Sequence, residues 1–133
     1  CAELTMAAYS AAVLERVRNP QRVGTLAEAP DVGTGEAGSL ESGTLARIQV
    51  RARQGRIVEA RFKVFGCSAA IAATGLVAEL LEGGSVEDAG RIVPERVVAE
   101  LDLPVERAHV AAIAVAAARD AVRQVSGSTE RWS

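Results

Sequence analysis

Apolar and polar residues alternate along two neighbouring stretches of the chain that meet at the turn Gln54-Gly55. A period of two places successive side chains on opposite faces of a strand, so the pattern predicts a half-buried antiparallel hairpin. Its polar face carries several arginines, which fits either a solvated sheet face or a docking surface for an acidic partner protein. The apolar positions are Ala46, Ile48, Val50, Val58, Ala60, Phe62 and Val64.

Helical spacing of apolar residues appears on both sides of this hairpin. An opening helix is expected over 7–18, and it stops at Asn19-Pro20 because a residue before proline is disfavoured in the helical conformation. Residues 21–44 are rich in glycine and are expected to form an extended or looping stretch. Three helices are expected after the hairpin, the first ending at Gly83-Gly84 and the last near residue 124. Capping or turn residues mark their beginnings: Ser68, Ser85 with Asp88, Pro94 and Pro104.

Strands followed by helices, without alternating strand-helix units, predict an α+β domain with helices packed on one face of an antiparallel sheet. A length of 133 residues suits one domain. We expect that domain over 1–125, with a flexible start at 1–8 and a polar C-terminal tail at 126–133. Met6 is an alternative start of the functional chain, which would make residues 1–5 an extension.

Composition and charge exclude several classes of function. The formal net charge of −2 provides no positive cluster for a polyanion, so nucleic acid binding is not expected. No apolar run approaches the roughly 18 residues of a membrane span, and the first residues lack the features of a secretory signal. We therefore expect a cytoplasmic protein that binds neither nucleic acid nor membrane.

The two cysteines, Cys1 and Cys67, lie far apart in sequence and form no disulfide framework, which is typical of a reducing compartment. Cys67 is expected at a strand-to-helix junction, where the helix N-terminus favours a thiolate. The alternative is a buried cysteine that acts as a small hydrophobic residue.

His109 is the only histidine of the chain. On the last predicted helix it shares a face with Val105, Ala112, Ile113 and Ala116, so its side chain is expected to face the core. A histidine in that position is either a hydrogen-bonded packing residue or a metal ligand.

Two further interpretations, dinucleotide binding and nucleophilic catalysis, have less support in the sequence. Gly33 to Gly38 match G-x-G-x-x-G, but no buried strand is expected before them and no helix after them, so we attribute these glycines to backbone freedom. Cys67 as nucleophile with His109 as base would need a third group to orient the histidine, and the sequence names none. We therefore expect a protein that is not an enzyme.

Several ordered motifs resemble the IscU/NifU N-terminal scaffold family, over a stretch from Tyr9 to about residue 124. The most specific is Ala60-Arg61-Phe62-Lys63 with Phe65-Gly66-Cys67, which is similar to A-R-F-K-x-[YF]-G-C. The others are Tyr9-Ser10, Val13, Asn19-Pro20, Val23-Gly24, Val32-Gly33-Thr34-Gly35 through Gly43, and Leu101-Asp102-Leu103-Pro104 with Ala108-His109.

The resemblance implies a scaffold on which a cysteine desulfurase, or another assembly protein, delivers sulfur while iron joins it to build a [2Fe-2S] cluster. It implies Cys67 and His109 as metal ligands. Three other ligand positions of the family differ, because Ser42, Thr44 and Val110 stand where the family has cysteine, aspartate and cysteine. The simultaneous differences favour natural divergence over an engineered Ser42.

One chain therefore offers two good ligands, whereas iron in these clusters is held by four. Cys1, Glu41 or a second protomer in a homodimer could supply the others, and we favour the homodimer. The expected cargo is a [2Fe-2S] cluster, iron or zinc, bound weakly or across the dimer. The alternative is a relative that has lost cluster binding and binds no metal, acting as a partner-binding or regulatory subunit or as a persulfide carrier through Cys67.

Overall fold

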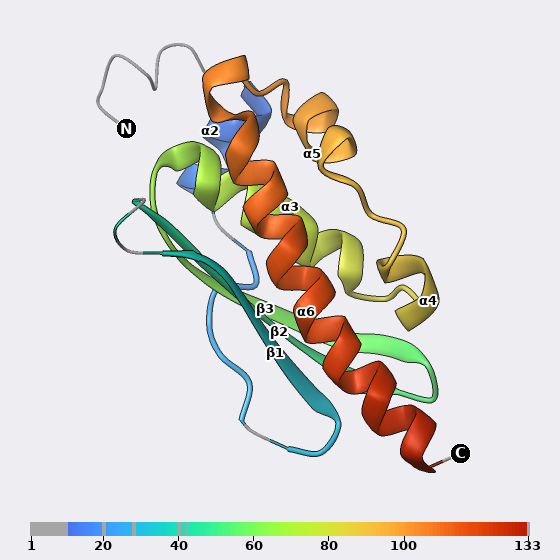
Figure 1. The fold of residues 1–133 in the computed structure, drawn as a ribbon. Helices are drawn as coiled ribbons and strands as arrows, with labels where there is room; N and C mark the ends of the chain where they lie inside the picture. The colour runs from blue at the N-terminus through green and yellow to red at the C-terminus, as the bar shows by residue number, and fades with distance from the viewer. Residues whose placement is uncertain (1–10, 20, 28, 40, 42, 133) are drawn as a thin grey trace.

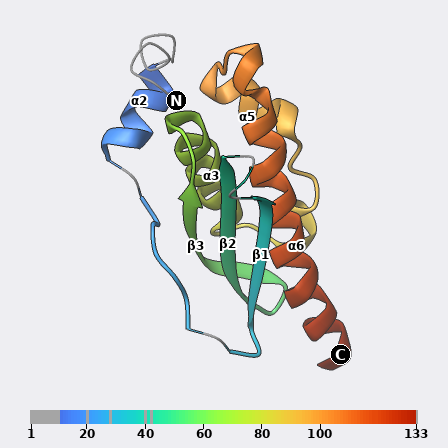
Figure 2. The same cartoon turned by 60° about the vertical axis from the view of Figure 1, so that its left-hand side comes forward.

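The computed structural model describes residues 11–19, 21–27, 29–39, 41 and 43–132, with the backbone alone for 106 and 126–132. Three antiparallel strands form a sheet in the order β1 (Val32–Ser39), β2 (Thr44–Arg53) and β3 (Arg56–Phe65). Helices α3 and α6 lie across one face of this sheet (Figures 1 and 2), which confirms the predicted α+β fold class. The helices are α2 (Ala11–Arg18), α3 (Ser68–Leu81), α4 (Val86–Ala89), α5 (Pro94–Leu101), the 3-10 turn η1 (Val105–Arg107) and α6 (Ala108–Trp132).

The predicted hairpin is confirmed as β2 and β3, and most of its expected apolar positions are buried, but Val58 is 45% exposed and Val64 is half-buried. A register shift between Arg51 and Ala52 accompanies this change, and Ile57 is buried in place of Val58.

Within the stretch 21–44, which was expected to be extended or looping, residues 32–39 are extended and form strand β1, which the sequence did not identify as part of the sheet. Gly33 and Gly35 point at α6, and a Cβ atom at these positions would lie 2.1 Å from the Ala121 carbonyl oxygen and 2.0 Å from that of Ala117. The helix backbone thus occupies the space where apolar side chains would have revealed a strand, and close approach rather than backbone freedom explains these two glycines.

The helix boundaries differ from the predicted ones in three places. Cys67 takes the N-cap position of α3 and Ser68 is the first helical residue. Ser85 does cap a helix, because its Oγ accepts a hydrogen bond from the Asp88 N–H at 3.0 Å, but the helix is a separate short one, α4. Helix α6 continues to Trp132, through the range predicted as a polar tail, because nothing there forces a helix to end and one glycine costs only about 1 kcal/mol.

Three expectations about the N-terminus lie outside the described residues: the flexible start at 1–8, the helix beginning at residue 7 and the alternative start at Met6. In the part of the chain that the structure describes, none of the helices is both long enough and apolar enough to cross a membrane.

The outer edge of β3 is covered by two other segments of the chain. The Gly24 N–H donates to the Phe62 carbonyl at 3.0 Å, and the Phe62 N–H donates to the Arg22 carbonyl at 2.9 Å. Further along the edge, the Ala60 N–H donates to Glu82 Oε2 at 3.0 Å. Covering an edge in this way prevents pairing with the strand of another molecule.

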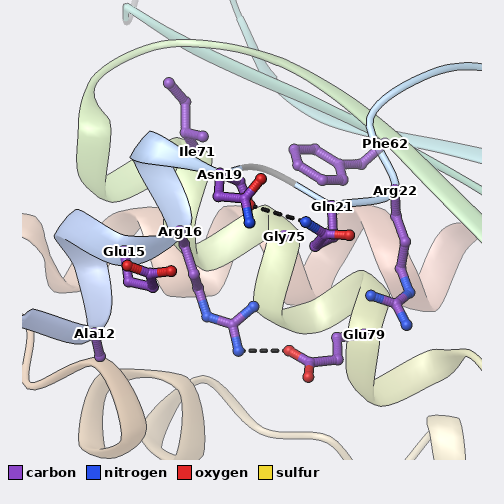
Figure 3. A pocket seen from close by; sticks show the side chains of 10 residues that line it. All are labelled: Ala12, Glu15, Arg16, Asn19, Gln21, Arg22, Phe62, Ile71, Gly75 and Glu79. Carbon is purple, nitrogen blue, oxygen red and sulfur yellow. Dashed lines mark hydrogen bonds and ion pairs between the residues drawn. The ribbon is translucent and has the colours of Figure 1, made fainter.

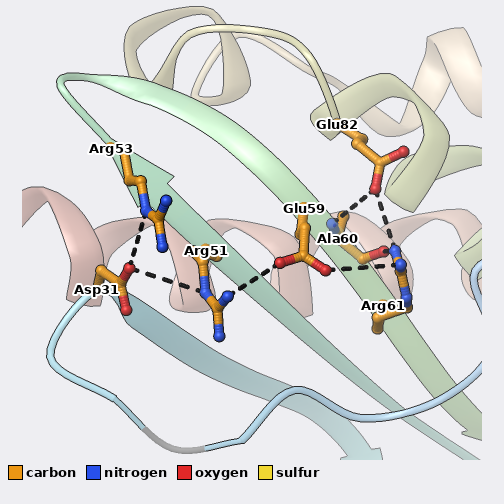
Figure 4. Close-up of polar contacts among 7 residues, drawn as sticks. All are labelled: Asp31, Arg51, Arg53, Glu59, Ala60, Arg61 and Glu82. Atoms are coloured by element: carbon orange, nitrogen blue, oxygen red, sulfur yellow. Dashed lines mark hydrogen bonds and ion pairs between the residues drawn. The ribbon is translucent and has the colours of Figure 1, made fainter.

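Alternating charges connect the arginines of the hairpin on the outer face of the sheet (Figure 4). Arg51 lies 3.1 Å from Glu59 and 3.7 Å from Asp31, and Arg61 lies 3.1 Å from Glu82 and 3.6 Å from Glu59. Because these guanidinium groups already have carboxylate partners inside the fold, the structure favours a solvated face over a docking surface for an acidic protein.

Glu82 is where this network meets the edge of β3. Burial raises the pKa of Glu82, but hydrogen bonds from the Ala60 N–H and from Arg22 and Arg61 outweigh it and hold the pKa below its ordinary value. A carboxylate with a lowered folded-state pKa stabilises the fold above its unfolded-state pKa, and this contribution is lost as the pH falls through the folded-state pKa.

Glu82→Gln is therefore expected to lower the free energy of unfolding by about 1 to 2 kcal/mol at pH 7, because charge-assisted hydrogen bonds are lost. The difference from wild type should shrink as the pH falls through the lowered folded-state pKa of Glu82, because the wild-type carboxylate then becomes protonated. Urea unfolding at pH 7 and at lower pH measures both effects. Glu87→Gln is the control, since Glu87 is 81% exposed; a constant Glu82→Gln difference at all pH values would contradict the account.

Candidate functional site

Cys67 lies where β3 gives way to α3, as the sequence predicted. Gly66 makes the turn with a φ of +159°, and a Cβ atom there would lie 3.1 Å from that of Ala70. The turn leaves the Cys67 side chain half-buried at the beginning of a 14-residue helix. Backbone N–H groups at such a helix end favour negative charge nearby.

The Cys67 side chain opens into a hollow of about 650 Å³, which we call the Cys67 hollow. Three parts of the chain meet there: the beginning of β2, the junction of β3 with α3, and the beginning of α6. None of the described residues that line it is acidic. They are Gly43, Thr44, Val64, Phe65, Gly66, Cys67, Ser68, Ile71, Arg107 and His109.

His109 does not face the core, so that prediction was wrong. Its side chain is exposed, as are Val105, Ala112 and Ala116, which were expected to share its buried face. Alanine occurs on both the exposed and the buried side of α6, so the sequence does not distinguish the two sides clearly. The buried residues of α6 are Val110, Ala111, Ala114, Val115, Ala117, Ala118, Ala121, Val122 and Val125. The exposed His109 lies on the rim of the Cys67 hollow, so both predicted metal ligands line the same hollow.

The other predicted positions are dispersed. Val110 is 1% exposed and belongs to the core rather than to the hollow, whereas Thr44 lines the hollow and is 6% exposed. Glu41 is exposed in the turn before β2 and does not line the hollow. Ser42 and Cys1 lie outside the described residues.

Sequence reasoning missed two residues of the hollow, Phe65 and Arg107. Phe65 is 58% exposed, which is unusual for one of only two phenylalanines in the chain. Its place next to Gly66-Cys67 in the motif could have pointed to it, whereas no sequence signal singled out Arg107.

The side chains of the hollow do not make a complete metal site within one chain. Among the described residues, no three or more histidine, cysteine, aspartate or glutamate side chains gather closely enough to hold a metal ion. One thiolate and one imidazole remain, and an iron-sulfur cluster needs four protein ligands. A single chain therefore does not fit a [2Fe-2S] cluster.

A second hollow, of about 320 Å³, lies between α2, α3 and the segment that covers the edge of β3 (Figure 3). Arg16 on α2 pairs with Glu79 on α3 at its rim, and the Gln21 amide donates to the Asn19 carbonyl at 3.3 Å. These polar groups pair with one another, and the Arg16–Glu79 ion pair joins α2 to α3. We therefore interpret this hollow as part of the packing between the two helices.

Comparisons with known proteins agree with this fold and motif order. The model of the NifU-like N-terminal domain matches residues 8–131. The iron-sulfur cluster assembly scaffold protein IscU of Azotobacter vinelandii is 40% identical over 118 residues, which cover 87% of this chain and 92% of that protein. IscU of Haemophilus influenzae is 36% identical over 117 residues, covering 86% and 93%.

Two solved structures share the fold. A NifU-like N-terminal protein from Brucella abortus has a TM-score of 0.69 at 20% identity and covers 89% of this chain and 94% of its own. The putative scaffold protein for the SUF system from Fervidobacterium islandicum has a TM-score of 0.65 at 15% identity and covers 89% and 98%.

Proposed function

The chain belongs to the NifU-like N-terminal domain family, and we propose that it acts as a scaffold in iron-sulfur cluster assembly with a reduced set of metal ligands. One observation carries the proposal: Cys67 and His109, 42 positions apart in sequence, line the same hollow. Thiolate and imidazole are ligands that suit iron and zinc.

The reduced ligand set predicts weak binding. Hydroxyl groups such as those of Ser42 and Thr44 ionise reluctantly, and Val110 has no donor atom. Two protein ligands leave the remaining positions of a metal ion to solvent or to another molecule, so iron or zinc bound by one chain should exchange readily.

The role that we propose is that of a scaffold rather than a catalyst. None of the described lining residues is a carboxylate that could orient His109 as a general base. The sulfur would come from a cysteine desulfurase or another assembly protein. A reducing compartment such as the cytoplasm would keep the Cys67 thiol free for this chemistry.

Anaerobic reconstitution with ferrous iron and sulfide tests the proposal, with bound iron and acid-labile sulfide per chain measured by equilibrium dialysis, which also detects readily exchanging metal. Wild type should retain both, and Cys67→Ala should lose nearly all of both because the thiolate is gone. Cys1→Ala is the matched control, since it removes the other cysteine and should retain wild-type loading. Equal iron and sulfide in Cys67→Ala and wild type would overturn the proposal.

A second candidate, the persulfide carrier, is favoured by the open space in front of Cys67. The Cys67 thiolate would attack the outer sulfur of a donor persulfide, form a new S–S bond and release the donor thiolate, with no net oxidation. Intact-mass measurement after incubation with a desulfurase and cysteine would show one added sulfur in wild type and none in Cys67→Ala. That adduct, found without any retention of iron, would favour the carrier over the scaffold.

A further inference from the structure

An apolar groove of about 590 Å³ lies between α5 and the beginning of α6, which pack side by side (Figure 1). We call it the α5–α6 groove. Pro94, Val98 and Ala99 of α5 form one wall, and Ala108 and Ala112 of α6 form the other. Ala99 and Ala112 are exposed, so the described part of the chain leaves the groove open to solvent. An open apolar groove between two helices can hold the apolar face of a third helix.

The surface around the α5–α6 groove is acidic. Residues 86–102, from the beginning of α4 to the C-cap of α5, contain five acidic and two basic residues and therefore have a net charge of −3. The whole chain has a net charge of −2, so the other residues together carry +1. The two arginines of this stretch pair with three of its carboxylates. Within the described part of the chain, Glu95 and Asp102, near the two ends of α5, have no ion-pair partner.

We propose that the α5–α6 groove binds a basic amphipathic helix of a partner protein. The apolar side chains of that helix pack on Val98 and Ala112, and a lysine or arginine beside them pairs with Glu95, which lines the groove. The eight residues of α5 are about 12 Å long, so the groove accommodates about two turns of a bound helix. Two turns are enough to present apolar anchors at positions i, i+3 or i+4, and i+7.

A second copy of this chain fits the groove less well than a basic partner does. In a two-fold symmetric pair the same patch faces itself, so the groove of one chain would lie against that of the other. The carboxylates of Glu95 and Asp102 would then meet their own counterparts, and like charges across an interface weaken it. The same negative charge disfavours nucleic acid and anionic lipid. The groove therefore selects a partner helix that carries positive charge.

The α5–α6 groove borders the Cys67 hollow without being part of it. His109 lines both, and no other described lining residue is shared between them. A helix bound in the groove would therefore lie next to the candidate metal site. The contacts that hold it need no metal, so the groove and the proposed scaffold function can be tested separately, and the failure of one leaves the other intact.

Fluorescence anisotropy of a labelled helical peptide of about 15 leucine and lysine residues, titrated with the metal-free chain, tests the proposal. Wild type should bind it about tenfold or more tightly than the same peptide with glutamate in place of lysine. Ala112→Arg should weaken binding of the lysine peptide about tenfold or more, because a long cationic side chain fills the groove. Ala27→Arg is the matched control, since Ala27 is also exposed but lies in the segment before β1, and it should bind like wild type.

Two further variants keep the test decisive if Ala112→Arg does not fold. Ala99→Arg fills the groove from the opposite wall and should weaken binding in the same way. Glu95→Lys should reverse the preference, so that the glutamate peptide binds more tightly than the lysine peptide. Glu87→Lys makes the same change in net charge on α4, outside the groove, and should keep the wild-type preference.

Three results would overturn the proposal. The first is no binding of the lysine peptide to wild type. The second is equal binding to wild type and to folded Ala112→Arg and Ala99→Arg. The third is wild type that forms pairs of chains in size-exclusion chromatography with light scattering, which Ala112→Arg separates, because a second copy would then be the occupant of the groove.

Discussion

Gly35→Ala is expected to lower the free energy of unfolding by about 3 kcal/mol, because the change forces an added atom into a fully packed contact. The new Cβ atom would lie 2.0 Å from the Ala117 carbonyl oxygen and 2.5 Å from the Ala121 nitrogen. Both atoms belong to the backbone of α6, so the clash cannot be relieved by rotating a side chain. Urea unfolding of the variant and of wild type measures the loss.

Gly90→Ala is the matched control for this change. Gly90 has a φ of −70°, which any residue can adopt, and the nearest atom to an added Cβ is the Glu87 carbonyl oxygen at 3.5 Å. Its free energy of unfolding should stay within about 0.5 kcal/mol of wild type. Equal urea midpoints for Gly35→Ala and wild type would contradict the close packing of α6 on β1.

This packing also matters for the site. Helix α6 carries His109 near its beginning and rests on β1 through the positions opposite Gly33 and Gly35. A helix displaced by an added methyl group would move His109 relative to Cys67, which is fixed at the junction of β3 with α3. A folded Gly35 variant should therefore also bind metal less tightly than wild type.

The part of the fold that could be predicted from the sequence is the part encoded by side-chain periodicity. The hairpin of β2 and β3 shows it because apolar side chains such as Ile48 and Phe62 alternate with polar ones over most of both strands and are buried. Strand β1 could not be found in the same way, since Gly33 and Gly35 have no side chains and α6 packs on their backbone. A strand built for close helix contact lacks the pattern by which strands are recognised.

The sequence also predicted only part of the candidate site. Cys67 follows a clear strand and precedes a clear helix, so its place at the junction was evident from the sequence. His109 was assigned to the wrong face because α6 is rich in alanine on both sides, and only larger residues such as Val110 and Val115 mark the buried one. That Cys67 and His109 meet at one hollow depends on how α6 crosses the sheet, which no local pattern encodes.

Cys67→Ala is expected to weaken the binding of zinc at the hollow by about 100-fold or more, since loss of a direct ligand should cost at least as much as loss of a group that orients one. Zinc is a useful probe because it accepts thiolate and imidazole together at bonds of about 2.0 to 2.3 Å. It also has no redox chemistry and no unpaired electrons, so it can be studied in air by magnetic resonance. Cys1→Ala is the control and should bind zinc like wild type.

The most direct test of the central claim, that Cys67 and His109 act together as metal ligands, is the nitrogen-15 spectrum of the imidazole during a zinc titration. His109 is the only histidine, so its ring gives signals that need no further assignment. We expect these signals to shift with zinc in wild type and in Cys1→Ala, and to stay in place over the same range in Cys67→Ala. Signals that ignore zinc in wild type, or that shift equally in Cys67→Ala, would contradict it.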